Sequence, residues 1–331
     1  MSLVQVIGTH EYFIRNQSVQ RKIELLDFFN KKQGKAGLVG VSANAEKITI
    51  AHVVLEKGKP ALGFCEEFDA PTDKEREEIL EREVKRLGLE GTQTNFVLPH
   101  SDYKLFLVEA PKVESHEMEA AVKWKIKDLV DSNVDELAVT LFPVPDDAYR
   151  GQSDMVYVVA SRKSKIKQVV DLIVNSGLNL QSIDIPELVL MNISSRFCDD
   201  THGLAFIDLR SSGSTLNLSK EGSIYLTRHL NTRVDQNIFN SEEWASVKER
   251  LVLEIERSLD YYESQMGQSP ISKIQITPGE NESDMLVAQL NELMAVQVTG
   301  LKLADEFESE EKYPEALLQS CILAIGGAMR N

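Results

Sequence analysis

The chain has 331 residues, of which 42% are hydrophobic and 27% charged, and its formal net charge is −16. Because single cores stop growing near ~250–300 residues, we expect two sizeable cores. The acidic balance excludes a nucleic-acid binder, which needs a basic surface, and disfavours broad contact with anionic lipid. No stretch approaches the ~18–20 apolar residues of a membrane span, and the first residues lack the pattern of a secretory signal, so we expect a cytoplasmic location.

One segment near the start departs from the acidic balance. Between residues 12 and 35, six lysine and arginine residues interleave with phenylalanine, isoleucine and leucine. This pattern predicts a basic amphipathic helix, and we assign residues 1–36 to a leader. Two interpretations stay open: the leader packs on the body of the protein, or it touches a membrane surface.

A repeated strand pattern opens both halves of the chain. Each half begins with three strand-like runs separated by tight turns, followed by helical sequence. The six runs are Leu38–Ser42, Lys47–Leu55, Ala61–Phe68, Leu204–Leu209, Ser214–Leu218 and Ser223–His229. The pattern predicts an α/β protein with two ribonuclease-H-like lobes arranged as in actin and FtsA, spanning residues 37–200 and 201–331.

A further unit lies between the two strand triplets. Three strands and a helix are predicted there: Tyr103–Glu109, Leu137–Val144, Met155–Ser161 and a helix from Ser115 to Val130. We expect residues 103–163 to form a small α+β subdomain inserted into the first lobe, with Leu107 and Val139 on neighbouring strands. The apolar stripe of the helix is Met118, Val122, Ile126 and Leu129, and Trp124 falls outside it.

Several segments resemble the PilM/MshI family of type IV pilus assembly proteins, MshI being the member that serves mannose-sensitive haemagglutinin (MSHA) pili. The run Ser258–Gln265 is similar to the family's "RSLDYFESQ" helix, and Ala324–Arg330 to its closing "ALGLALR". The stretch Glu117–Val130, with Trp124 between two lysines, resembles the "EAVRWEAEKYIP" helix of the family's inserted subdomain. The order and spacing of these segments cover nearly everything from residue 37 onward.

This resemblance implies a non-catalytic cytoplasmic scaffold, recruited to the inner-membrane face of a type IV, MSHA-like pilus assembly platform. Its implied partner is a PilN-like bitopic inner-membrane protein, whose cytoplasmic tail adds to a strand edge of the inserted subdomain. The assembly motor ATPase is a second implied partner. We expect the tail groove between the inserted subdomain and the first lobe, with Met118, Val122 and Trp124 as candidate contacts.

The fold also implies a nucleotide cleft between two hairpins, whose backbone N–H groups and aspartates hold phosphate and Mg²⁺. In the first hairpin, Ser42 stands at the acidic position of the family and Asn44 at its glycine position. The second hairpin keeps Asp208, but Arg210 replaces the glycine two residues later. The loop after this aspartate offers three further candidate contacts, Ser211, Ser212 and Gly213.

The loop on the adenosine side is altered as well. Gly279 is preceded by Pro278, which has no N–H, and followed by Glu280, whose charge opposes a polyphosphate. With all three loops changed, we expect a vestigial cleft and neither ATPase activity nor a bound cofactor. An actin-like protein that binds ATP with Mg²⁺ is the alternative, and the cytoplasmic domain of a type II secretion platform protein is another. The six histidines show no ligand spacing, so no metal site is expected.

Overall fold

The computed structural model describes residues 34–56, 59–114, 116–131, 133–149, 154–234, 238, 241–277, 283–307 and 313–330. Residues 1–33 of the predicted leader, Ser115 and the loop 278–282 lie outside these ranges, and the leader stays a prediction. Within the described ranges, none of the helices is both long and apolar enough to cross a bilayer.

The first lobe is built on a sheet of five strands in the order β3-β2-β1-β4-β8. The first three strands pair antiparallel, and β4 and β8 continue the sheet in parallel. Its elements are β1 (Leu38–Ala43), β2 (Lys47–Glu56), β3 (Lys59–Asp69), α2 (Asp73–Leu87), β4 (Gln93–Val97), α4 (Lys163–Asn175) and β8 (Asn179–Asp184). Thr72 and Glu75 form a capping box that fixes the start of α2, and Gly88 ends it in the left-handed conformation.

The second lobe repeats this order with β11-β10-β9-β12-β13, again three antiparallel strands followed by two parallel ones. Its elements are β9 (Leu204–Asp208), β10 (Ser214–Lys220), β11 (Ser223–Leu230), α6 (Trp244–Ser264), β12 (Lys273–Thr277), α7 (Ser283–Asn291), β13 (Gln297–Gly300) and the 3-10 turn η5 (Leu303–Asp305). The six predicted strand runs match β1 to β3 and β9 to β11 to within two residues at each end.

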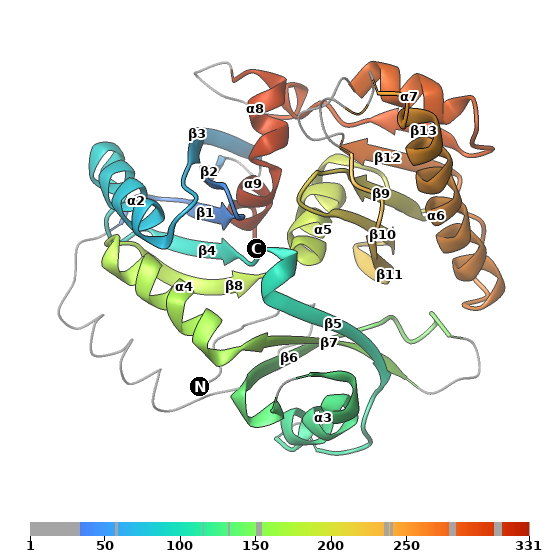
Figure 1. The fold of residues 1–331 in the computed structure, drawn as a ribbon, viewed down its shortest axis with the longest axis horizontal. Helices are drawn as coiled ribbons and strands as arrows, with labels where there is room; N and C mark the ends of the chain where they lie inside the picture. The colour runs from blue at the N-terminus through green and yellow to red at the C-terminus, as the bar shows by residue number, and fades with distance from the viewer. Residues whose placement is uncertain are drawn as a thin grey trace.

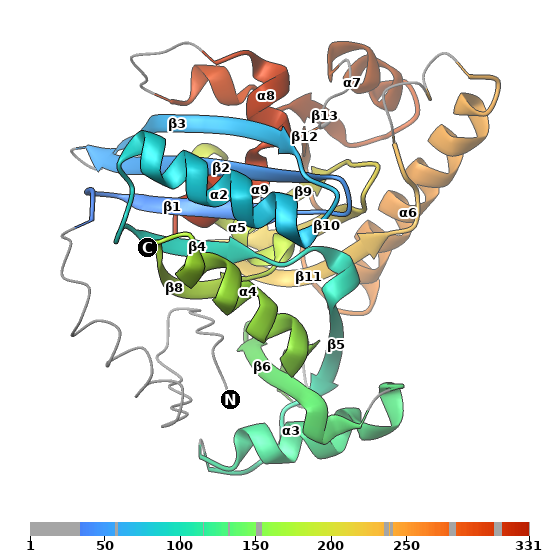
Figure 2. The same ribbon diagram turned by 60° about the vertical axis from the view of Figure 1, so that its left-hand side comes forward.

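Helices α5 (Pro186–Phe197), α8 (Glu315–Ser320) and α9 (Ile322–Ala328) join the two lobes. Figure 1 shows α5 between the two sheets, and Figure 2 shows α2 and α4 on the opposite face of the first sheet from α9. Helix α9 lies against β1, β2 and β4 although it comes last in the chain. A buried apolar cluster with members from α5, α9 and both sheets, including Ile193, Phe206 and Ile325, makes the lobes one packed body.

The inserted unit is a separate three-stranded sheet in the order β5-β7-β6. Its elements are the 3-10 turn η1 (His100–Asp102), β5 (Tyr103–Glu109), α3 (Met118–Ile126), the 3-10 turns η2 (Lys127–Leu129) and η3 (Val134–Glu136), β6 (Leu137–Pro143) and β7 (Met155–Arg162). The prediction that Leu107 and Val139 lie on neighbouring strands is wrong. The last strand, β7, inserts between β5 and β6 and pairs antiparallel with both.

Candidate functional site

A cleft of about 630 Å³ separates the hairpins that open the two lobes. It brings together most of the residues predicted for a nucleotide site. Those that line it are Ser42 and Asn44 of the first lobe and Ser211, Ser212 and Gly213 of the second. Asp208 lies at the end of β9 and is 1% exposed, while Gly279 falls outside the described residues.

The first hairpin uses its own backbone N–H groups internally. The Asn44 side-chain oxygen accepts hydrogen bonds from the backbone N–H groups of Glu46 and Lys47, both at 2.9 Å. The Asn44 N–H also donates to the Lys47 carbonyl at 3.0 Å, which closes the turn. Three amide groups of this turn are therefore already used within the hairpin, two of them by the side chain of the asparagine in the glycine position.

A polar chain continues from this hairpin across the cleft. The ammonium of Lys47 lies 2.6 Å from a carboxylate oxygen of Glu67 on β3. The second oxygen of Glu67 accepts a short hydrogen bond from the hydroxyl of Ser320, at the end of α8. Lys47 is therefore paired with a carboxylate of its own lobe, and that carboxylate is tied to the junction helix α8.

The second hairpin carries its own cation. The Arg210 Nε donates to an Asp208 carboxylate oxygen at 2.7 Å, and the hydroxyl of Thr277 donates to the other oxygen at 2.8 Å. The guanidinium also donates to two carbonyl oxygens at the end of α8, Gln319 at 2.6 Å and Ser320 at 3.1 Å. A cation at a helix C-terminus is stabilised by the partial negative charge of its free carbonyls.

These contacts decide how well the cleft suits a magnesium nucleotide. Asp208 is neutralised by Arg210, the first hairpin has a serine in place of its acid, and Asn44 holds the turn amides. Across the described part of the chain, no three His, Cys, Asp or Glu side chains cluster to hold a metal ion. The side chains around the cleft do not fit a Mg²⁺–polyphosphate group. Arg210 already supplies a cation to Asp208, and the amide groups of the first turn already donate hydrogen bonds within the protein.

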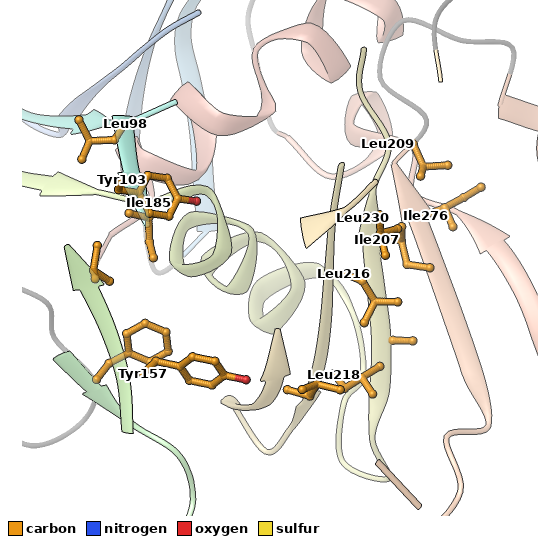
Figure 3. Packing of buried hydrophobic residues seen from close by; sticks show 14 of the residues in the cluster. Leu98, Tyr103, Tyr157, Ile185, Ile207, Leu209, Leu216, Leu218, Leu230 and Ile276 are labelled. Atoms are coloured by element: carbon orange, nitrogen blue, oxygen red, sulfur yellow. The ribbon is translucent and has the colours of Figure 1, made fainter. Parts of the chain in front are cut away.

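A second hollow, of about 480 Å³, runs between the inserted sheet and the second lobe. Leu105 and Leu107 of β5 line one side, and Leu226, His229 and Tyr261 are among the residues that line the other. The Tyr157 hydroxyl of β7 accepts a hydrogen bond from the Thr227 backbone N–H at 3.0 Å and so joins the two walls. In Figure 3 the hydroxyls of Tyr103 and Tyr157 both point toward the second lobe.

Glu187, on the first turn of α5, lies at the base of this hollow and is only 2% exposed. Its carboxylate accepts from the Tyr103 hydroxyl at 2.8 and 2.6 Å. Burial raises the pKa of Glu187 to about 7. His100 lies 4.0 Å away, but burial, the neighbouring His229 and the positive charge of Arg210 lower the pKa of His100 to about 3, so this imidazole is neutral at physiological pH.

The two edges of the inserted sheet differ in exposure. The four central residues of β5, 105 to 108, are all apolar and all half-buried. The corresponding run of β6 is mostly buried, with α4 and α3 packed against the strand. An edge strand presents unpaired backbone N–H and C=O groups, and proteins normally cover an apolar edge so that no other strand pairs with it. Because β5 is the less covered edge of this sheet, it is the edge suited to accept another strand.

The predicted partner contacts on α3 divide. Val122 is fully buried in the core of the inserted subdomain and Met118 packs against that core, so the assignment of Val122 as a contact is wrong. Trp124 is 73% exposed, and the ammonium of Lys127 lies 4.9 Å from its ring centroid. Leu129, predicted in the buried stripe, is 54% exposed because the helix changes to a 3-10 turn at Lys127.

Two hollows bear on the predicted tail groove, whose position stays a prediction. The hollow along β5 has the second lobe as its other wall, whereas the groove was predicted between the inserted unit and the first lobe. A smaller hollow of about 340 Å³ lies among α2, α4 and the first hairpin, and reaches the inserted unit only at the start of β5, near Asp102. Sequence reasoning missed Glu187 because only the fold brings its carboxylate beside Tyr103, 84 residues earlier.

The sequence matches no protein-family model and no curated protein. Solved structures do match. One chain of a PilM–PilN type IV pilus biogenesis complex is 18% identical with a TM-score of 0.69, and the match covers 89% of this chain and 98% of that one. The cytoplasmic domain of EpsL, an inner-membrane component of the type II secretion system of Vibrio cholerae, is 11% identical with a TM-score of 0.50, over 89% and 96% of the two chains.

A Bacteroides thetaiotaomicron protein of unknown function with an actin-like ATPase fold is 9% identical, with a TM-score of 0.53 over 88% of this chain and 97% of that one. At these identities the likeness concerns the fold. The chain therefore has the two-lobed actin-like fold that the repeated strand triplets predicted, and the three-stranded sheet between the triplets is the predicted small inserted subdomain.

Proposed function

We propose that this protein is a non-catalytic scaffold on the cytoplasmic face of the inner membrane, in a type IV pilus assembly platform of the MSHA kind. In this role it binds the short cytoplasmic tail of a PilN-like bitopic protein. The main support for a non-catalytic role is the ion pair between Arg210 and Asp208. In a nucleotide-binding lobe, the aspartate at this position binds the Mg²⁺ ion or its waters. The pilus part rests on the likeness to the PilM chain and on the sequence resemblance.

The edge strand β5 is the place proposed for the tail. A short tail has little side-chain area to bury, but each peptide group that pairs with an edge strand contributes a hydrogen bond. Leu105 and Leu107 point into the hollow beside this edge and offer apolar contacts to alternate residues of an added strand.

The first experiment measures nucleotide binding. Calorimetry with MgATP should detect no binding below about the millimolar range, a free energy near 4 kcal/mol. A micromolar dissociation constant would favour the alternative of an actin-like ATP-binding protein and refute the argument from Asn44 and Arg210.

The second experiment measures the partner. The cytoplasmic tail peptide of the candidate inner-membrane protein should bind the intact chain, and Leu107→Asp should weaken binding by about tenfold or more because it places a charge in the groove. Leu253→Asp, at an exposed leucine of α6, is the matched control and should bind like the parent. Equal binding by both variants would show that the tail does not bind at β5.

A further inference from the structure

The groove between β5 and β11 ends at a buried carboxylate that lacks a cation. In the described part of the chain, the one ion-pair neighbour of Glu187 is His100, at 4.0 Å, and that imidazole is neutral at physiological pH. The hydrogen bonds from Tyr103 come from a single hydroxyl shared between both oxygens. The backbone N–H of Glu187 is a second donor to this carboxylate. A carboxylate has about four acceptor sites, so these two donors leave part of its capacity unused.

The other charged and titratable groups around Glu187 do not neutralise it. Arg228 of β11 lines the groove, but its guanidinium stacks 5.0 Å from the Tyr261 ring centroid and reaches the Ser258 hydroxyl at 3.4 Å. Burial and a nearby arginine lower the pKa of His229, which favours its neutral form. Burial raises the pKa of Tyr157 above its ordinary value, so this phenol carries no charge.

A buried, uncompensated carboxylate costs free energy that an incoming cation can recover. An anion is repelled by the same charge, and a divalent metal lacks further ligands at this place among the described residues. A lysine or arginine side chain fits best, because its apolar stem can lie along Leu105 or Leu226 while its charged head reaches Glu187.

We propose that this groove selects an extended apolar peptide that carries one cationic side chain, and that Glu187 is the residue that pairs with the cation. The inference deepens the proposed function, on which it rests for the nature of the ligand, by naming the chemistry that the tail must carry. Leucine-like residues on alternate positions face the β5 wall, and the lysine or arginine lies at the end of the groove near His100.

The test uses probes that do not depend on which protein is the partner. An array of seven-residue peptides with leucine at alternate positions has one of these leucines replaced in turn by lysine, norleucine or glutamate, because only alternate side chains of an extended segment face the same wall. The folded full chain should bind the best lysine peptide about tenfold more tightly than its norleucine counterpart, and the glutamate peptide least. Glu187→Gln keeps the shape of the side chain and the hydrogen bond from Tyr103, and should abolish the preference for lysine.

The control variant is Glu263→Gln, which removes an equal charge from an exposed position of α6 and should keep the lysine preference. The second measurement is the pH dependence of peptide affinity. Because a bound cation favours the ionised carboxylate, the affinity for the lysine peptide should rise between pH 6 and pH 8 in the parent and stay flat in Glu187→Gln.

The outcomes separate the two proposals. If the tail of the pilus partner binds but Glu187→Gln binds it and the array as the parent does, the role of Glu187 is overturned while the scaffold function stands. If the array shows the lysine preference but the pilus tail does not bind, the groove chemistry is supported and the pilus assignment fails. Equal binding of lysine and norleucine peptides by the parent also overturns the inference.

Discussion

Replacing Arg210 by alanine tests whether the cleft is held together by the protein's own cation. In the native cleft this guanidinium joins Asp208 of the second lobe to the last carbonyls of α8, which in turn is tied to Glu67 of the first lobe. The substitution removes one charge of an ion pair whose other member is 1% exposed. It also leaves two helix carbonyls without these donors.

The size of the effect follows from burial. Stranding one member of a buried ion pair costs about 3–5 kcal/mol. The Arg210 side chain is 16% exposed, so water can enter the vacated space, and we expect the lower end of this range, about 3 kcal/mol. A loss of that size lowers the melting temperature by roughly 5 °C in a chain of this length.

Two variants make the measurement specific. Arg233→Ala removes an exposed arginine that lines the same cleft and should melt within about 1 °C of the parent, as surface substitutions do. Adding Asp208→Asn to Arg210→Ala removes the stranded charge and should recover about 1–2 kcal/mol, a coupling expected only of residues in contact. The assay is thermal unfolding followed by circular dichroism, at low and high salt. If Arg210→Ala and Arg233→Ala melt alike, or if the second substitution recovers nothing, the guanidinium does not hold the lobes.

Three further predictions concern other parts of the molecule. Trp124→Ala should leave the melting temperature within about 1 °C of the parent, because a side chain that is 73% exposed contributes little to the core; a loss of several degrees would contradict the exposed position. Since burial raises the folded-state pKa of Glu187 to about 7, its contribution to stability is full below the unfolded pKa and is lost as pH rises through 7. Glu187→Gln should therefore reduce the fall in melting temperature between pH 5 and pH 8, and an unchanged fall would contradict the raised pKa. Gly40→Ala should lower expression and the melting temperature strongly, because its added carbon would lie 1.7 Å from the Ala324 carbonyl oxygen, and a stable variant would refute this close approach of β1 to α9.

The parts of the fold that sequence predicted well are those governed by local signals. Tight turns and alternating apolar residues located β1 to β3 and β9 to β11, because a hairpin is specified within a few residues of itself. The strand order of the inserted sheet was not specified in this way. Its central strand β7 comes last in the sequence, so the pairing of Leu107 with a β7 residue depends on the return of the chain.

The candidate site shows the same division. From sequence, Asn44 and Arg210 could be recognised as missing glycines, since glycine has a specific role in a phosphate-binding turn. The contacts that the replacing side chains make could not be predicted. The Arg210 guanidinium binds carbonyl groups about 110 residues later in the chain, and Glu187 meets a tyrosine 84 residues earlier. Neither pairing leaves a periodic or spaced signal, so only the tertiary structure reveals it.

The position of α9 has a consequence for how the protein is made. Its residues 322–328 cover the face of a sheet whose first strand is residues 38–43, and Asn95 in the interior of that sheet donates a 2.8 Å hydrogen bond to the Gly327 carbonyl. At about 5–20 residues per second, a ribosome needs roughly 15–55 s to add the residues between them. During that interval the first sheet has an uncovered apolar face, and it cannot complete its core as the nascent chain emerges. The lobe that is synthesised first can therefore complete its core only after the last helix has been made, and slowing translation should lengthen its dependence on chaperones.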